Sequence, residues 1–151
     1  MIRLRKILLV EDNPNDIELT LEALTKQKLG NRVVVLTDGV EAMEYLLYEN
    51  KYAGRERENP SVILLDIKMP RMDGIEVLQA IKKNNELKTI PVVMLTSSRE
   101  EPDLKKCYDL GVNAYIVKPV DFKDFFDAVK HLGIFWALLN ELPPNGGLKD
   151  E

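Results

Sequence analysis

Five short runs of mainly apolar residues constrain what this chain can fold into. They cover residues 6–10, 33–37, 62–66, 92–95 and 114–117. A run without polar alternation is typical of a strand buried on both faces, as in a parallel sheet covered by helices. Segments with capping residues and helical spacing separate the runs, so the alternation predicts an α/β fold, a doubly wound five-stranded parallel sheet with helices on both faces.

Helix starts are marked by capping residues, such as Asn13-Pro14, which supplies an N-cap and a proline at the first helical position. We expect helices over about residues 14–28, from 39, from 74, over 102–111 and over 122–142. The second of these is expected to turn four residues inward, namely Ala42, Met43, Leu46 and Leu47. Residues 49–60 are charged and aperiodic, which predicts a surface loop.

Length and composition exclude several classes of protein. A chain of 151 residues indicates one domain, which we expect over residues 1–142, with a flexible tail at 143–151 and no output domain. A net charge of −4 argues against direct binding of nucleic acid. No apolar run reaches the roughly 18 residues of a membrane span, and the apolar run after residue 6 is too short for a signal peptide. With a single cysteine, Cys107, the expected location is cytoplasmic.

The predicted strands end in residues that are chemically complementary. Parallel strands share one edge at their carboxyl ends, and in open α/β sheets ligands bind outside that edge. The residues collected there are Glu11, Asp12, Asp66, Thr96 and Lys118. Each is ordinary alone, as a strand-ending or helix-capping residue, but together they form a set of three carboxylates, one hydroxyl and one ammonium.

This set predicts phosphoryl chemistry with a divalent cation. Clustered carboxylates raise one another's pKa, and Mg²⁺, which prefers oxygen ligands, relieves their repulsion. Lys118 can hold one oxygen of a phosphoryl group and Thr96 can donate a hydrogen bond to another. Asp66 is then left as the nucleophile, since carboxylates are known to form aspartyl phosphates.

The same residues carry a resemblance to a known family. The chain resembles a two-component response regulator receiver domain (CheY-like) over about residues 5–131. The matching motifs are Leu-Val-Glu11-Asp12-Asn13, Leu-Leu-Asp66-Ile-Lys-Met-Pro70 with Asp73-Gly74, Leu-Thr96-Ser97, and Lys118-Pro119.

The resemblance implies a role for each position. Asp66 accepts a phosphoryl group from a sensor histidine kinase. The implied ligands of Mg²⁺, which Mn²⁺ can replace, are Glu11, Asp12, Asp66 and the backbone carbonyl of Lys68. The implied phosphoryl contacts are Thr96, Ser97 and Lys118, with a cis peptide bond between Lys118 and Pro119. Thr96 and Tyr115 are the implied switch, and the output surface consists of the fourth helix, fifth strand and fifth helix.

The last predicted helix indicates a partner. It would be about 31 Å long at the α-helical rise, which overshoots a domain of this size. Its end carries Ile134, Phe135, Trp136 and Leu138, which need a cover. A homodimer through the fourth helix, fifth strand and fifth helix is the favoured cover, and a kinase or a downstream protein is the alternative. Three segments carry a narrower resemblance: the charged loop at 49–60, the run Asp12-Asn-Pro-Asn-Asp16 and the pair Phe135-Trp136. Together they resemble single-domain regulators paired with bacterial, notably cyanobacterial, phytochrome histidine kinases.

Two enzyme or cofactor classes compete with a phosphorylated switch. An aspartate-nucleophile phosphatase needs a carboxylic acid two residues after the nucleophile, where this chain has Lys68. A flavodoxin-like cofactor carrier needs a phosphate cradle after the first strand, where Glu11 and Asp12 would repel a phosphate. We therefore expect no enzyme beyond a switch that catalyses its own phosphorylation and dephosphorylation.

Overall fold

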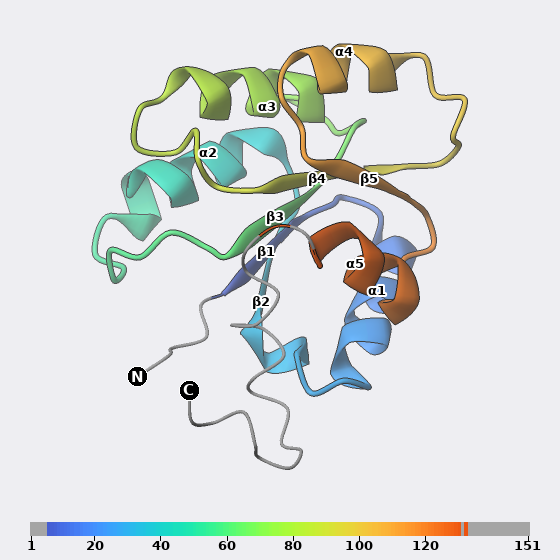
Figure 1. Ribbon diagram of the computed structural model, residues 1–151. Helices are drawn as coiled ribbons and strands as arrows, with labels where there is room; N and C mark the ends of the chain where they lie inside the picture. Colours follow the sequence, from blue (N-terminus) through green and yellow to red (C-terminus); the bar gives the residue numbers. More distant parts are fainter. Residues whose placement is uncertain (1–5, 131, 133–151) are drawn as a thin grey trace.

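The computed structural model describes residues 6–130 and residue 132, and its centre is a five-stranded parallel sheet (Figure 1). The strand order is β2-β1-β3-β4-β5. The strands are β1 (Ile7–Val10), β2 (Val33–Leu36), β3 (Val62–Asp66), β4 (Val92–Thr96) and β5 (Ala114–Val117). The predicted doubly wound α/β fold is confirmed, and each predicted strand agrees with the structure to within one residue at either end.

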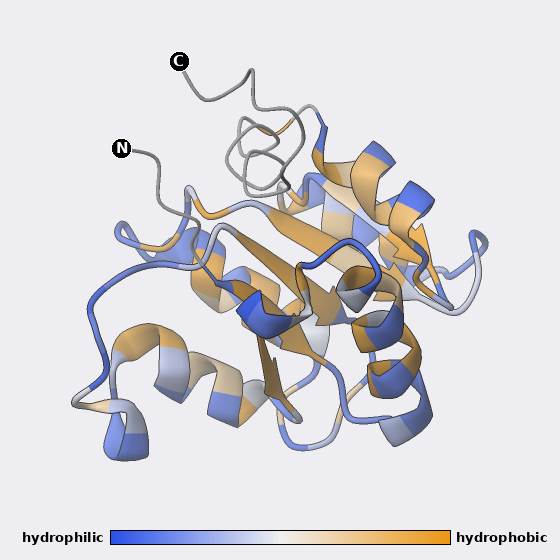
Figure 2. Ribbon diagram, turned by 90° about the horizontal axis from the view of Figure 1, so that it is seen from below, coloured by the Kyte–Doolittle hydropathy of each residue, from blue (hydrophilic) through white to orange (hydrophobic). Residues whose placement is uncertain are grey.

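Helices cover both faces of the sheet. On one face lie α1 (Pro14–Thr25) and α5 (Phe122–Val129), and on the other lie α2 (Gly39–Leu47), α3 (Gly74–Lys83) and α4 (Asp103–Asp109) (Figure 1). Two short 3-10 helices, η1 (Gly30–Arg32) and η2 (Asn50–Tyr52), lie in the connections. Figure 2 shows apolar strands between helices whose outer sides are hydrophilic.

The two hydrophobic cores explain the unbroken apolar runs. Along β1, Leu8 and Val10 belong to the core under α2, α3 and α4, whereas Ile7 and Leu9 belong to the core under α1 and α5. Because both faces of the strand are buried, both sets of alternating side chains must be apolar. The same arrangement in β3 and β4 leaves only the strand ends free to carry polar groups.

Helix ends differ from the sequence-based expectation. Helix α1 ends at Thr25, not near Lys28, because the chain reverses there: Lys28 has a φ of 65° and the Leu29 N–H donates to the Leu24 carbonyl at 2.9 Å. Helix α4 is shorter than predicted at both ends. The predicted extension of α5 to residue 142, the four residues Ile134, Phe135, Trp136 and Leu138, and the tail at 143–151 lie outside the described residues.

The end of α2 and the loop after it also correct the prediction. Leu47, expected inward, is 37% exposed, and Tyr45 is buried in its place. The guanidinium carbon of Arg55 lies 3.8 Å from the centre of the Tyr45 ring and 4.2 Å from that of Tyr48. The loop is therefore a packed cation–π arrangement and not simply a solvated connection. Among the described helices, none combines the length and apolar character needed to cross a bilayer.

Candidate phosphoryl-binding site

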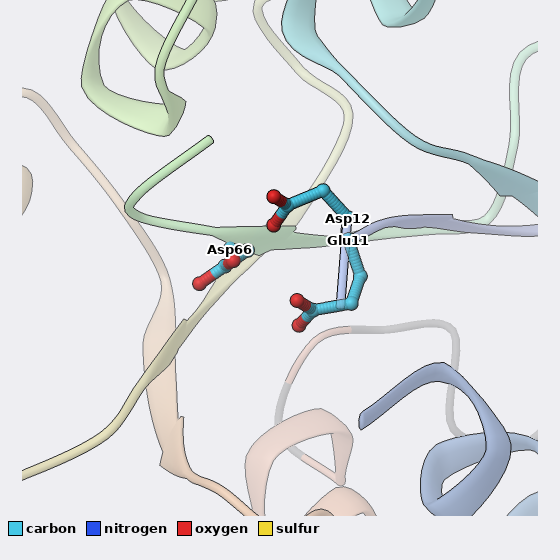
Figure 3. Close-up of side chains that lie close together, drawn as sticks. All are labelled: Glu11, Asp12 and Asp66. Carbon is cyan, nitrogen blue, oxygen red and sulfur yellow. The ribbon is translucent and has the colours of Figure 1, made fainter. Parts of the chain in front are cut away.

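Three carboxylates meet at the carboxyl ends of β1 and β3. Val10 lies opposite Leu65 in the sheet, so the residues that follow, Glu11 and Asp66, are neighbours across the strands. Carboxylate oxygens of Glu11, Asp12 and Asp66 all lie within 4.8 Å of one another (Figure 3). Glu11 and Asp66 are buried while Asp12 is exposed. This arrangement gives a possible cation three oxygen ligands and an open side for water or substrate.

Lys118, the residue after β5, joins this group. Its Nζ lies 3.2 Å from Glu11 Oε1, 3.0 Å from Asp16 Oδ2 and 3.2 Å from Asp66 Oδ1. Burial alone would lower the pKa of the Lys118 ammonium, but the hydrogen bond to Asp16 and the charges of Asp66 and Glu11 raise it above its usual range. Lys118 is therefore a fixed positive charge beside Asp66.

The carboxylates are not fully compensated by this one cation. Burial, followed by the charge of Asp66, raises the pKa of Glu11 to about 7, although Lys118 and the Asn13 N–H act in the opposite direction. Burial also raises the pKa of Asp66, against the lowering effect of Lys118. The ionised site is thus short of positive charge, which favours the binding of a divalent cation.

Thr96 and Ser97 form the β4 side of the site. Thr96 is buried, and its hydroxyl donates to the Ser98 carbonyl at 3.0 Å and accepts from the Ser98 N–H at 3.3 Å. Ser97 is exposed at the entrance. Because a hydroxyl has one proton, Thr96 could donate to another acceptor only by giving up the Ser98 carbonyl. The Lys118–Pro119 peptide bond is cis, in agreement with the expectation.

One cavity of about 230 Å³ brings the predicted phosphoryl and metal residues together. Its lining includes Glu11, Asp12, Asp66, Lys68, Thr96, Ser97 and Lys118. It also includes Asp16 and Glu101, which strand-end reasoning missed because neither ends a strand. Asp16 stands in the first turn of α1, where an acidic residue is expected merely to favour the helix dipole, so its sequence position gave no distinct signal.

Tyr115 does not line this cavity. It is half-buried on β5, and its ring packs edge-on against Tyr108 of α4 at a centroid distance of 6.3 Å. Both rings line a separate groove of about 360 Å³ between α4, β5 and α5, together with Arg99, Asp124 and Asp127. The aromatic residue predicted as a switch thus lies on the predicted output surface.

Similar proteins carry the same domain. Residues 7–130 match the family model of the response regulator receiver domain. Response regulator Rcp1 of Synechocystis sp. is 42% identical over 137 residues, which cover 91% of this chain and 92% of Rcp1.

Two solved structures are similar as well. The bacteriophytochrome response regulator AtBRR is 59% identical with a TM-score of 0.84, and the match covers 91% of this chain and 99% of AtBRR. The phosphorylated cyanobacterial phytochrome response regulator RcpA is 46% identical with a TM-score of 0.72, over 89% of this chain and 94% of RcpA. Because the family model spans most of the chain and these relatives match nearly their whole length, the chain belongs to the family of response regulator receiver domains.

Proposed function

We propose that the chain is a phosphorylated signalling switch whose acceptor is Asp66. The observation that carries this proposal is the Lys118 ammonium, which lies 3.2 Å from Asp66 Oδ1 inside a cavity that also contains Glu11, Asp12 and Thr96. A carboxylate nucleophile is productive when the incoming phosphoryl group finds positive charge and hydrogen-bond donors already in place. In the reaction, an Asp66 oxygen forms a bond to phosphorus as the bond between phosphorus and a histidine nitrogen of the kinase breaks.

The residues of the site fit a divalent cation. Glu11, Asp12, Asp66 and the backbone carbonyl of Lys68 would hold Mg²⁺, with Mn²⁺ as a substitute. Bound there, the cation would neutralise the carboxylates and the phosphoryl oxygens. The raised pKa values of Glu11 and Asp66 support this assignment, because burial makes both ionised carboxylates costly and the charge of Asp66 adds to that cost at Glu11, which a bound cation would offset.

The chain's own residues then report the phosphorylated state. Lys118 holds one phosphoryl oxygen, Ser97 leaves room at the entrance, and the Thr96 hydroxyl exchanges the Ser98 carbonyl for another phosphoryl oxygen. As Thr96 moves, Tyr115 turns inward from Tyr108, which alters the groove between α4, β5 and α5. The chain thus catalyses only the phosphorylation and dephosphorylation of its own Asp66, and it has no other substrate in this proposal.

The groove also supports a proposed partner surface. Tyr108, which lines the groove, is one of the large hydrophobic residues that are exposed in the described part of the chain. We expect a second copy to cover this surface together with Ile134, Phe135, Trp136 and Leu138, and a kinase or downstream protein is the alternative. Light scattering of the whole chain tests the homodimer: a monomer before and after phosphorylation would exclude it.

Binding of Mg²⁺ is expected to strengthen with pH up to about pH 7. Glu11, with a pKa of about 7, must lose its proton to become a ligand, so affinity should rise up to about tenfold per pH unit below pH 7 and level off above it. Calorimetric titration at constant ionic strength measures this, with Glu11→Gln as the variant that should lose both the affinity and its pH dependence. An affinity that is constant from pH 5 to 8 would contradict the role of Glu11.

The stability of the metal-free protein is expected to change in the opposite direction. A carboxyl group whose pKa is raised on folding stabilises the fold below its unfolded pKa, here 4.5, and this contribution is lost as pH rises through about 7. Metal-free protein should therefore be less resistant to urea at pH 8 than at pH 5, and Mg²⁺ should reverse the loss at pH 8.

The proposed signal source is a phytochrome histidine kinase in the cytoplasm, on the strength of the similarity to the regulators AtBRR and RcpA. Phosphotransfer tests this directly. The whole chain should take the phosphoryl group from such a kinase within seconds to minutes, to an extent that differs between red and far-red light. Equal transfer from unrelated histidine kinases, or none from phytochrome kinases, would contradict the proposed pathway.

A further inference from the structure

Glu101 is a charged residue of the phosphoryl cavity that the proposed chemistry does not use. It lies in the loop between β4 and α4, and its side chain is only 10% exposed. Within the described part of the chain, its Oε2 atom is buried without a hydrogen-bond partner. The ammonium of Lys68 lies 3.9 Å from this oxygen, which is close enough for charge attraction but too far for a hydrogen bond.

A purely structural role would not favour this arrangement. A buried carboxylate oxygen without a hydrogen bond is costly, and stable folds normally pair such groups. Glu101 is in addition a fourth glutamate or aspartate around Asp66 and Lys118, in a cavity that must admit an anion. Its charge therefore opposes the entry of a phosphoryl donor unless a cation masks it.

Lys68 is the nearby cation that can neutralise the charge of Glu101. It follows Asp66 by two residues, lines the same cavity, and its side chain is 73% exposed, so it can move between Glu101 and a group in the cavity. The long ion-pair distance, together with this exposure, indicates a weak pair that an incoming anion can separate. The two side chains thus line the same cavity as Asp66.

We propose that Glu101 and Lys68 form an electrostatic gate that selects phosphoryl donors by charge. Glu101 repels small, doubly charged donors and holds Lys68 away from the phosphoryl group, which leaves delivery to a docked kinase. Glu101 is thus a positioning and specificity residue for the transfer to Asp66. This inference rests on the proposed function, since it needs Asp66 to accept a phosphoryl group.

The test compares two small donors at pH 7, namely acetyl phosphate, which is mostly a dianion there, and phosphoramidate, which is mostly a monoanion. Glu101→Gln is expected to speed phosphorylation by acetyl phosphate about threefold to tenfold at low salt, with a smaller gain for phosphoramidate. The gain should shrink in high salt, because the charges are then screened. Lys68→Gln should lower the rate of phosphorylation by acetyl phosphate by a similar factor. Glu100→Gln, an exposed neighbour outside the cavity, is the matched control and should behave as wild type.

Several results would overturn the gate. Equal rates for Glu101→Gln and Glu100→Gln would do so, and so would a gain that is the same for both donors or insensitive to salt, which would indicate altered packing. If Glu101→Gln fails to fold, an unchanged rate in Lys68→Gln, a substitution at an exposed side chain, would also overturn it. If wild type accepts no phosphoryl group from either donor, the proposed function itself fails. If wild type is phosphorylated but Glu101→Gln and Glu100→Gln react at equal rates, only the gate fails.

Discussion

Replacement of Lys118 by methionine is expected to slow phosphorylation of Asp66 by about 100-fold. This is the usual cost of losing one preorganised hydrogen-bond donor at an oxygen that gains negative charge in the reaction. In the structure the Lys118 ammonium contacts Asp66, Glu11 and Asp16 at once, and methionine keeps the length of the side chain without its charge. The rate of phosphorylation by acetyl phosphate in saturating Mg²⁺ measures the effect. A loss of less than about threefold would show that Lys118 does not hold the phosphoryl group.

The same substitution is expected to weaken the fold in a pH-dependent way. Without Lys118 the buried carboxylate of Glu11 has lost its cation, which should cost about 3 kcal/mol of unfolding free energy at pH 8 without metal. The loss should be smaller at pH 5, because Glu11, whose pKa is already about 7, then binds a proton. Urea unfolding at the two pH values checks this.

Lys123→Met is the control for that measurement. Lys123 is an exposed residue of α5 whose ion pair with Asp127 lies on the surface, so its loss should change unfolding little. If the two variants unfold at the same urea concentration at pH 8, the three contacts of Lys118 do not stabilise the site.

The strands and the strand-end residues could be predicted because one physical constraint determines both. A strand buried on both faces has to be apolar, so its first polar residue marks where the strand leaves the core. In a parallel sheet these exits meet at one edge. Asp66, Glu11 and Lys118 were therefore found from the sequence, and in the structure one carboxylate oxygen of Asp66 and one of Glu11 lie 3.2 Å from the Lys118 ammonium.

Residues that reach the site from helices and loops could not be predicted in this way. Asp16 has the sequence environment of any first-turn helix residue, and Glu101 that of any loop glutamate. Only the position of α1 and the path of the loop between β4 and α4 bring them to the cavity. The contact of Arg55 with Tyr45 could not be predicted for the same reason. The loop that carries Arg55 has no hydrophobic periodicity that would indicate packing against α2. Helix ends, as at Thr25, depend on local reversals that apolar spacing does not encode.

The identity of the acceptor has the largest expected effect of any single change. Asp66→Asn removes the nucleophilic oxygen and keeps the size of the side chain, so phosphorylation should be abolished, not slowed. Asp109→Asn, on the exposed surface of α4, makes the same chemical change outside the cavity and should leave phosphorylation as in wild type. Both variants should fold, which circular dichroism checks.

Mass spectrometry of the intact chain after treatment with Mg²⁺ and acetyl phosphate is the most direct measurement. We predict that wild type and Asp109→Asn gain one phosphoryl group, that the group is lost in mild base as expected of an acyl phosphate, and that Asp66→Asn gains none. A base-labile phosphoryl group on Asp66→Asn at the wild-type level, or a wild-type chain that remains unmodified at every Mg²⁺ concentration, would contradict the assignment of Asp66 as the acceptor.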